Sequence, residues 1–259
     1  MTGATTFATT LAAVYRPLLT FAGVMLAWQV LTMIPVAPSF ILPSPADVAA
    51  RAWLSRESLA VNASVTFGAA LAGFALGAGF GALNALTLIR SEGARRWLLP
   101  LLIGGQAVPV FALAPILTLW FGYGPTAKIV MTILVVYFPV TAAFYDGLRR
   151  CDPALLDLAR VMNATPQQVL WRIRIPGALP ALGSGLRLAA VFAPISAVIG
   201  EWTGGSAGLG YLMLYANART QADLLFAALI LLALMGVALH ALVSHLTRRA
   251  TRWAPETTL

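Results

Sequence analysis

Few side chains in this sequence can do chemistry on a substrate. The 259 residues include nine acidic side chains, two histidines and one cysteine. The His-Glu-x-x-His pattern of zinc proteases is missing. Cys151 alone offers neither a disulfide nor a thiolate metal site, and His240 and His245 point in different directions on one helix. We therefore expect no catalytic residue, no metal, no cofactor and no enzyme activity.

Glu201 is the acidic residue attached most directly to the end of an apolar segment. An ionisable group at such a depth can serve gating or substrate passage, but near a helix end it can also reach water. We favour a solvated helix-end residue and keep the functional role as the alternative. Residues 200–211 read Gly-Glu-Trp-Thr-Gly-Gly-Ser-Ala-Gly-Leu-Gly-Tyr, which predicts a broken or re-entrant segment rather than a continuous helix.

The elements that position these residues are apolar helices. The chain is 59% hydrophobic and 10% charged with a mean hydropathy of +0.83, whereas soluble domains are about 25% charged. This composition predicts an all-α integral membrane protein that forms one domain over residues 1–259. Long uncharged segments predict about six transmembrane helices, near residues 18–37, 57–90, 96–128, 128–148, 181–200 and 223–248.

The net charge of +8 reflects topology rather than nucleic-acid binding. With both termini in the cytoplasm, all but four of the 17 basic residues fall on the cytoplasmic side, in agreement with the positive-inside rule. The four on the outside are Arg51, Arg56, Lys128 and Arg219. We therefore expect a multi-pass protein of a bacterial inner membrane, surrounded by lipid, with cytoplasmic termini and a cytoplasmic Cys151.

Small and helix-breaking residues indicate how the helices pack. Gly73, Gly77 and Gly81 share one face at four-residue spacing, which predicts a close helix contact. The segment 96–128 contains paired glycines and prolines, so we expect it to face protein or a water-filled path. Candidate residues of a translocation path are Gln106, Pro109, Tyr137, Ser196 and Glu201.

Residues 152–176 form a polar, basic segment between apolar ones. Asp152 can cap a helix that starts at Pro153, and Thr165 can cap a second one that starts at Pro166, with Gln168 completing a Thr-x-x-Gln capping box. Asn163 tolerates the left-handed backbone conformation and so favours a turn between the two helices. The pattern predicts two short helices that meet at a corner outside the membrane.

This corner resembles the cytoplasmic EAA loop of ATP-binding-cassette (ABC) importer permeases, with all spacings kept. Asp157-Leu158-Ala159 stands for Glu-Ala-Ala, Asn163 for the following Gly, and Ile173-Arg174-Ile175-Pro176 for Ile-x-Leu-Pro. The resemblance extends from about Pro43 to Trp253 and implies a type I importer permease fold with an EAA-like loop at 149–180. The residues that it implies in ATPase coupling are Asp157, Leu158, Ala159, Arg160, Val161, Met162, Asn163, Gln168 and Pro176.

The resemblance also implies partners. The sequence has no Gly-x4-Gly-Lys-Ser/Thr phosphate loop, so ATP would be hydrolysed by a separate pair of ABC ATPase subunits. An extracytoplasmic substrate-binding protein and a second permease copy, most simply in a homodimer, complete the importer that it implies. The chain looks most like the branch that imports nitrate, sulfonates, taurine and thiamine-precursor pyrimidines, with a lean toward the pyrimidines. The alternative is an ion-coupled secondary transporter, which would usually carry carboxylates or histidines at the midplane.

Overall fold

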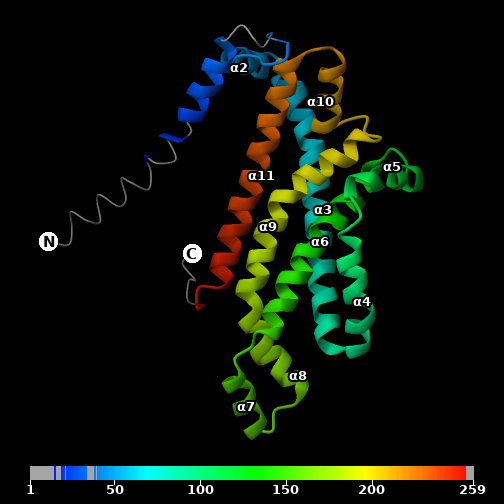
Figure 1. Cartoon of the computed structure of the whole chain (residues 1–259), viewed down its shortest axis with the longest axis vertical. Coiled ribbons are helices and arrows are strands. Elements are labelled where there is room, and N and C mark those ends of the chain that lie inside the picture. Colours follow the sequence, from blue (N-terminus) through cyan, green and yellow to red (C-terminus); the bar gives the residue numbers. More distant parts are fainter. Residues whose placement is uncertain (1–14, 16–18, 21, 34–37, 39, 255–259) are drawn as a thin grey trace, which may run out of the picture. The chain divides into compact units, whose positions relative to one another are not determined.

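The computed structural model describes residues 15, 19–20, 22–33, 38 and 40–254, and all regular structure in this part of the chain is helical (Figure 1). An apolar helix, Ala22–Met33, comes first. The elements that follow are α2 (Pro45–Leu54), α3 (Arg56–Arg90), α4 (Glu92–Gly105), α5 (Val110–Phe121), α6 (Pro125–Arg149), α7 (Pro153–Val161), α8 (Pro166–Val169), the π-helix η1 (Leu170–Arg174), α9 (Ile175–Trp202), α10 (Leu209–Ala218) and α11 (Ala222–Ala250).

The expected all-α fold is confirmed, and within the described residues four helices are long and apolar enough to cross a membrane. They are α3, α6, α11 and the continuous helix Pro166–Trp202, which joins α8, η1 and α9. The segment predicted as one span at 96–128 is bent by 101° between α4 and α5, and counts as a fifth span if the bent pair crosses once. Pro109 at the bend has no amide hydrogen to continue α4.

The first predicted span, 18–37, lies partly outside the described residues. Its described helix, Ala22–Met33, is shorter than the roughly 20 residues that a span needs. The number of six spans therefore stays a prediction.

The contacts divide the chain into two compact units, Met1–Leu59 with Met213–Leu229, and Ala60–Leu212 with Ile230–Leu259. In the first unit, Ser44 and Asp47 form a capping box that starts α2. The indole N–H of Trp28 donates to the Pro43 carbonyl at 3.1 Å. The single domain over residues 1–259 stays a prediction.

The core of the second unit is built on the pairing of α6 with α9. Val136 and Val140 on α6 are buried against a row of alanines on α9, Ala189, Ala190, Ala193 and Ala197. Gly185 brings the two backbones still closer, since a Cβ atom there would lie 2.8 Å from the Pro139 carbonyl oxygen. Close packing of small side chains is what holds helices together where lipid provides no hydrophobic drive.

The glycine face of α3 is a helix contact, as the sequence predicts. A Cβ atom on Gly73 would overlap Thr132 of α6. One on Gly77 would lie 2.9 Å from Val136 Cγ1, and one on Gly81 would lie 2.5 Å from the carbonyl oxygen of Tyr137. The Thr141 hydroxyl reaches across the same contact and donates to the Gly81 carbonyl at 3.1 Å.

Candidate functional site

A buried carboxylate lies at the end of α9. Glu201 is only 1% exposed, and its oxygens accept hydrogen bonds from the Thr66 hydroxyl of α3 at 2.9 Å and from the Gly210 amide of α10 at 2.7 Å. Lys128, in the first turn of α6, is 5% exposed and its ammonium lies 3.7 Å from the Glu201 carboxylate. Three transmembrane helices and the start of α10 therefore meet at one ion pair.

The same residues hold the loop 203–208, which connects α9 to α10. The Lys128 ammonium donates to the Ala207 carbonyl at 2.7 Å, and the Gly208 amide donates to Asn62 Oδ1 at 2.8 Å. Thr66 also accepts from the Leu209 amide at 2.8 Å. Gly208 has φ = 120°, and a Cβ atom there would overlap the Glu201 carboxylate, so the loop needs glycine for both reasons.

The favoured interpretation of Glu201 as a solvated residue is wrong. Its carboxylate faces inward because α9 ends next to α3 and the first turn of α6, which supply a hydroxyl and a cation. The helix break after Trp202 is confirmed, since α10 begins only at Leu209. The sequence did not indicate a role for Lys128, because its partner Glu201 is far away along the chain. The position of Lys128 beside an apolar segment was the available signal for such a role.

The five candidate path residues differ in exposure: Gln106 and Pro109 are exposed, whereas Ser196 and Glu201 are buried. Gln106 and Pro109 are exposed at the bend between α4 and α5. The Tyr137 hydroxyl lies near this bend, 3.9 Å from where a Cβ atom on Gly105 would be. Ser196 is 1% exposed, and its hydroxyl donates to the Phe192 carbonyl of its own helix at 2.5 Å. Their role in a path stays a prediction.

The corner at 152–168 has the predicted local structure. Asp152 accepts from the Ala154 amide at 2.9 Å at the start of α7, and Thr165 and Gln168 form both bonds of the capping box. Asn163 has φ = 54°, in the left-handed region. Figure 1 shows α7 and α8 together beyond the ends of α6 and α9.

The second helix of the corner is not short. It continues from Pro166 through η1 into α9 as one helix of 37 residues. The turn before Pro176 widens into a π-helix, in which the Ile175 amide donates to the Leu170 carbonyl. This wider turn lets the helix pass a proline, which lacks an amide hydrogen.

One face of α7 exposes apolar side chains outside the candidate spans. Leu158, Val161 and Met162 are 55%, 81% and 72% exposed, and Leu155 lies one turn before them. The Asp157 carboxylate and the Arg160 guanidinium form an exposed ion pair at 2.7 Å. Ala159 is 5% exposed, so its side chain is buried within this chain and not available to a partner.

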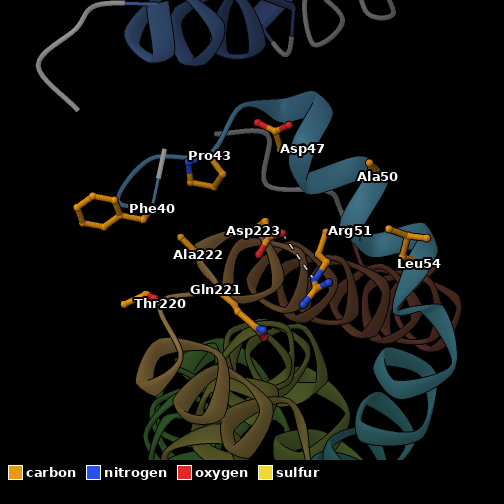
Figure 2. Close-up of a pocket in the computed structure, with 10 residues that line it drawn as sticks. All are labelled: Phe40, Pro43, Asp47, Ala50, Arg51, Leu54, Thr220, Gln221, Ala222 and Asp223. Atoms are coloured by element: carbon orange, nitrogen blue, oxygen red, sulfur yellow. Dashed lines mark ion pairs between the residues drawn. The ribbon is translucent and has the colours of Figure 1, made fainter. Parts of the chain in front are cut away.

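All four basic residues that the topology places outside have a partner. Lys128 pairs with Glu201, and Arg51 pairs with Asp223 at 3.7 Å. The Arg56 and Arg219 guanidinium groups lie over the rings of Trp53 and Tyr215. Arg51 and Asp223 face a pocket of about 620 Å³ in the first unit (Figure 2). The pocket is lined by Phe40, Pro43, Asp47, Ala50, Arg51, Leu54, Thr220, Gln221, Ala222 and Asp223.

Of the two histidines, His240 makes an interhelical hydrogen bond. Its Nδ1 lies 3.1 Å from the Arg187 carbonyl of α9, while His245 is exposed on α11. Within the described part of the chain, no group of three or more His, Cys, Asp or Glu side chains is arranged to hold a metal ion.

Apolar helices and a buried α6–α9 core define a multi-pass membrane protein. The chain belongs to the family described as "Binding-protein-dependent transport system inner membrane component", whose model matches residues 73–252. It is thus an inner-membrane permease subunit of an ABC importer, and not an enzyme.

Relatives along nearly the whole chain agree with this assignment. A probable ABC transporter permease protein of Haemophilus influenzae is 47% identical over 90% of this chain and 96% of its own length. The formylaminopyrimidine transport permease protein ThiX of Halalkalibacterium halodurans is 34% identical over 92% of this chain and 95% of its own. A structure of the MetNI methionine ABC transporter covers 77% of this chain and 97% of that chain, with 21% identity and a TM-score of 0.62, and so has the same fold.

Proposed function

We propose that this chain forms the membrane path through which an ATP-driven importer moves a small polar solute into the cytoplasm. Two ABC ATPase subunits dock on the corner around Asn163, and an extracytoplasmic binding protein delivers the solute. The observation that carries the proposal is the exposed apolar face of α7, with Val161 81% exposed outside the candidate spans. Holding such a face in water is unfavourable unless a partner covers it.

The orientation follows from the same segment. The ATPases are cytoplasmic, so the corner, Cys151 and both termini lie in the cytoplasm and Arg51, Lys128 and Arg219 lie outside. A second copy of the chain completes the path, because the six predicted spans of one copy are too few to enclose it. A two-fold homodimer is the simplest arrangement, and lipid covers the remaining apolar surface.

The solute is proposed to be a thiamine-precursor pyrimidine. The 34% identity to a formylaminopyrimidine permease supports this choice, which is also the solute class that the sequence resemblance favours. A riboflavin permease protein, RibX of Chloroflexus aurantiacus, is 35% identical, and an aliphatic sulfonates permease protein, SsuC of Bacillus subtilis, is 30% identical. Calorimetry on the cognate binding protein with a formylaminopyrimidine, riboflavin, taurine and nitrate distinguishes these classes, and binding of another of these solutes alone would refute the pyrimidine.

Among the described residues, the buried Glu201 is the feature that favours an ion-coupled transporter instead. Its carboxylate already has Lys128, the Thr66 hydroxyl and the Gly210 amide as partners. These groups neutralise the charge and occupy both oxygens, which argues against a site that binds and releases an ion in each cycle. The ATP-driven importer is therefore the better proposal.

The docking proposal is tested by adding a charge to the exposed face of α7. Val161→Glu should abolish copurification of the ATPase and solute uptake while the chain still inserts, because residue 161 is 81% exposed and outside the candidate spans. Trp253→Glu is the matched control, since Trp253 is an apolar residue, 59% exposed, beyond the end of α11. If Val161→Glu kept a bound ATPase and normal uptake, the corner would not be the docking element.

A further inference from the structure

The Glu201 carboxylate has no free side for a transported solute. One oxygen accepts from the Thr66 hydroxyl at 2.9 Å and lies 3.7 Å from the Lys128 ammonium. The other oxygen accepts from the Gly210 amide at 2.7 Å. Gly208 covers the group so closely that even a methyl side chain there would overlap it. A carboxylate enclosed in this way orders the groups around it rather than binding a ligand.

The groups that it orders belong to the connection between α9 and α10. Gly210 binds Glu201 directly, Leu209 binds through the Thr66 hydroxyl, and Ala207 binds through Lys128. Gly208 is held by Asn62. Four successive residues, 207–210, are thus fixed by side chains of α3, α6 and α9.

We propose that Glu201, Lys128 and Thr66 form a latch that holds the loop 203–208 and the start of α10 in place, and that they are positioning residues for transport. The inference rests on the proposed function, in which this loop lies at the outer end of the membrane path. The latch has two stable states. In the closed state the charges of Glu201 and Lys128 are paired, and in the open state both charges are in water. A half-open state is unfavourable because it leaves one charge buried without its partner.

The double change decides between a latch and a solute-binding carboxylate. Glu201→Gln keeps an acceptor for Gly210 but leaves the Lys128 charge buried and unpaired, and Lys128→Met leaves the Glu201 charge unpaired. Removing one member of a buried pair is strongly unfavourable, whereas replacing both is often neutral. The single variants should therefore open the loop, and Glu201→Gln with Lys128→Met should close it again.

The loop is monitored by a thiol at Leu209, which is 0% exposed. The full chain carrying Cys151→Ser and Leu209→Cys is placed in lipid nanodiscs and treated with N-ethylmaleimide. Glu201→Gln, Lys128→Met and Thr66→Val should each raise the labelling rate at least about tenfold. Thr66→Ser keeps the hydroxyl, and the double variant removes both charges, so both should label within about threefold of the parent.

A second reporter separates the latch from a general loss of stability. Ala193→Cys, in the α6–α9 core, is also 0% exposed. Latch variants should leave its labelling rate unchanged, whereas global unfolding would raise the rates at both positions and overturn the proposal. Equal labelling rates at Leu209→Cys in the parent and in the single variants would also overturn the proposal. A double variant that labels as fast as the single variants would overturn it as well.

Uptake provides the functional readout. In the assembled importer the single variants should lose uptake, and the double variant should recover it. If the double variant had a closed loop but no uptake, Glu201 would take a direct part in solute passage, and this result would overturn the positioning role. The labelling measurements need neither the ATPase nor the binding protein. A failed latch and a failed importer assignment are therefore distinguishable.

Discussion

The contact between α3 and α6 allows a sharp prediction about Gly81. A Cβ atom at this position would lie 2.5 Å from the Tyr137 carbonyl oxygen and 3.0 Å from Val140 Cβ. The first neighbour is backbone and the second is a buried β-branched side chain, so neither can move aside alone. Gly81→Ala therefore has to push the helices apart and stretch the 3.1 Å hydrogen bond from Thr141 to the Gly81 carbonyl.

Overpacking of this kind costs about 1–3 kcal/mol. Weakening the hydrogen bond adds about 0.5–1.5 kcal/mol. The better helix propensity of alanine returns about 0.5–1 kcal/mol. The net destabilisation expected for Gly81→Ala is therefore about 0.5–4 kcal/mol, which corresponds to a fall in Tm of roughly 1–16 °C for a chain of this length.

Gly79, on the same helix, provides the matched control. A Cβ atom there would meet nothing within 4 Å, so Gly79→Ala should leave Tm unchanged or raise it slightly. Thermal unfolding of the detergent-solubilised chain, followed by tryptophan fluorescence, compares the two variants. Equal Tm values for Gly81→Ala and Gly79→Ala would refute the close contact.

Three further predictions concern packing, topology and the corner. Gly77→Leu should lower the yield of folded protein, because a Cβ atom would already lie 2.9 Å from Val136 Cγ1; an unchanged yield by size-exclusion chromatography would contradict this. A membrane-impermeant maleimide should label Cys151 in lysed but not in intact cells, and efficient labelling without lysis would reverse the proposed orientation. Asn163→Gly should retain ATPase copurification, whereas Asn163→Val should reduce it severalfold, because φ = 54° suits glycine and strains a β-branched residue. Equal copurification of these two variants would show that the left-handed turn is not needed for docking.

Features that depend on neighbours in the sequence were predictable. Asp152, Thr165 and Asn163 act on the backbone within three residues, so their side-chain chemistry alone indicates caps and a turn. The glycine face of α3 was equally accessible, because four-residue spacing places small residues on one side of a helix.

Features that depend on segments far apart in the sequence were not predictable from it. Nothing near Glu201 in the sequence indicates that Lys128 lies 3.7 Å away, since the pairing arises from how α6 and α9 pack. The burial of Ala159 likewise depends on tertiary packing, and it removes the expected contact of this side chain with an ATPase. The continuity of the helix through Pro176 depends on a π-helical turn that local propensity does not indicate.

The continuous helix Pro166–Trp202 has a mechanical consequence. At 1.5 Å per residue its 37 residues extend about 55 Å, nearly twice the roughly 30 Å thickness of the hydrocarbon core. Pro166 begins one end, beside the corner, and Glu201 lies at the other. If this helix moves as a lever, a tilt of about 5° at the corner displaces the Glu201 end by about 5 Å, close to one helical pitch. In the proposed importer, a small movement of ATPases docked on the corner would then be enough to break hydrogen bonds at the Glu201 end, with no relay of side chains between the two ends.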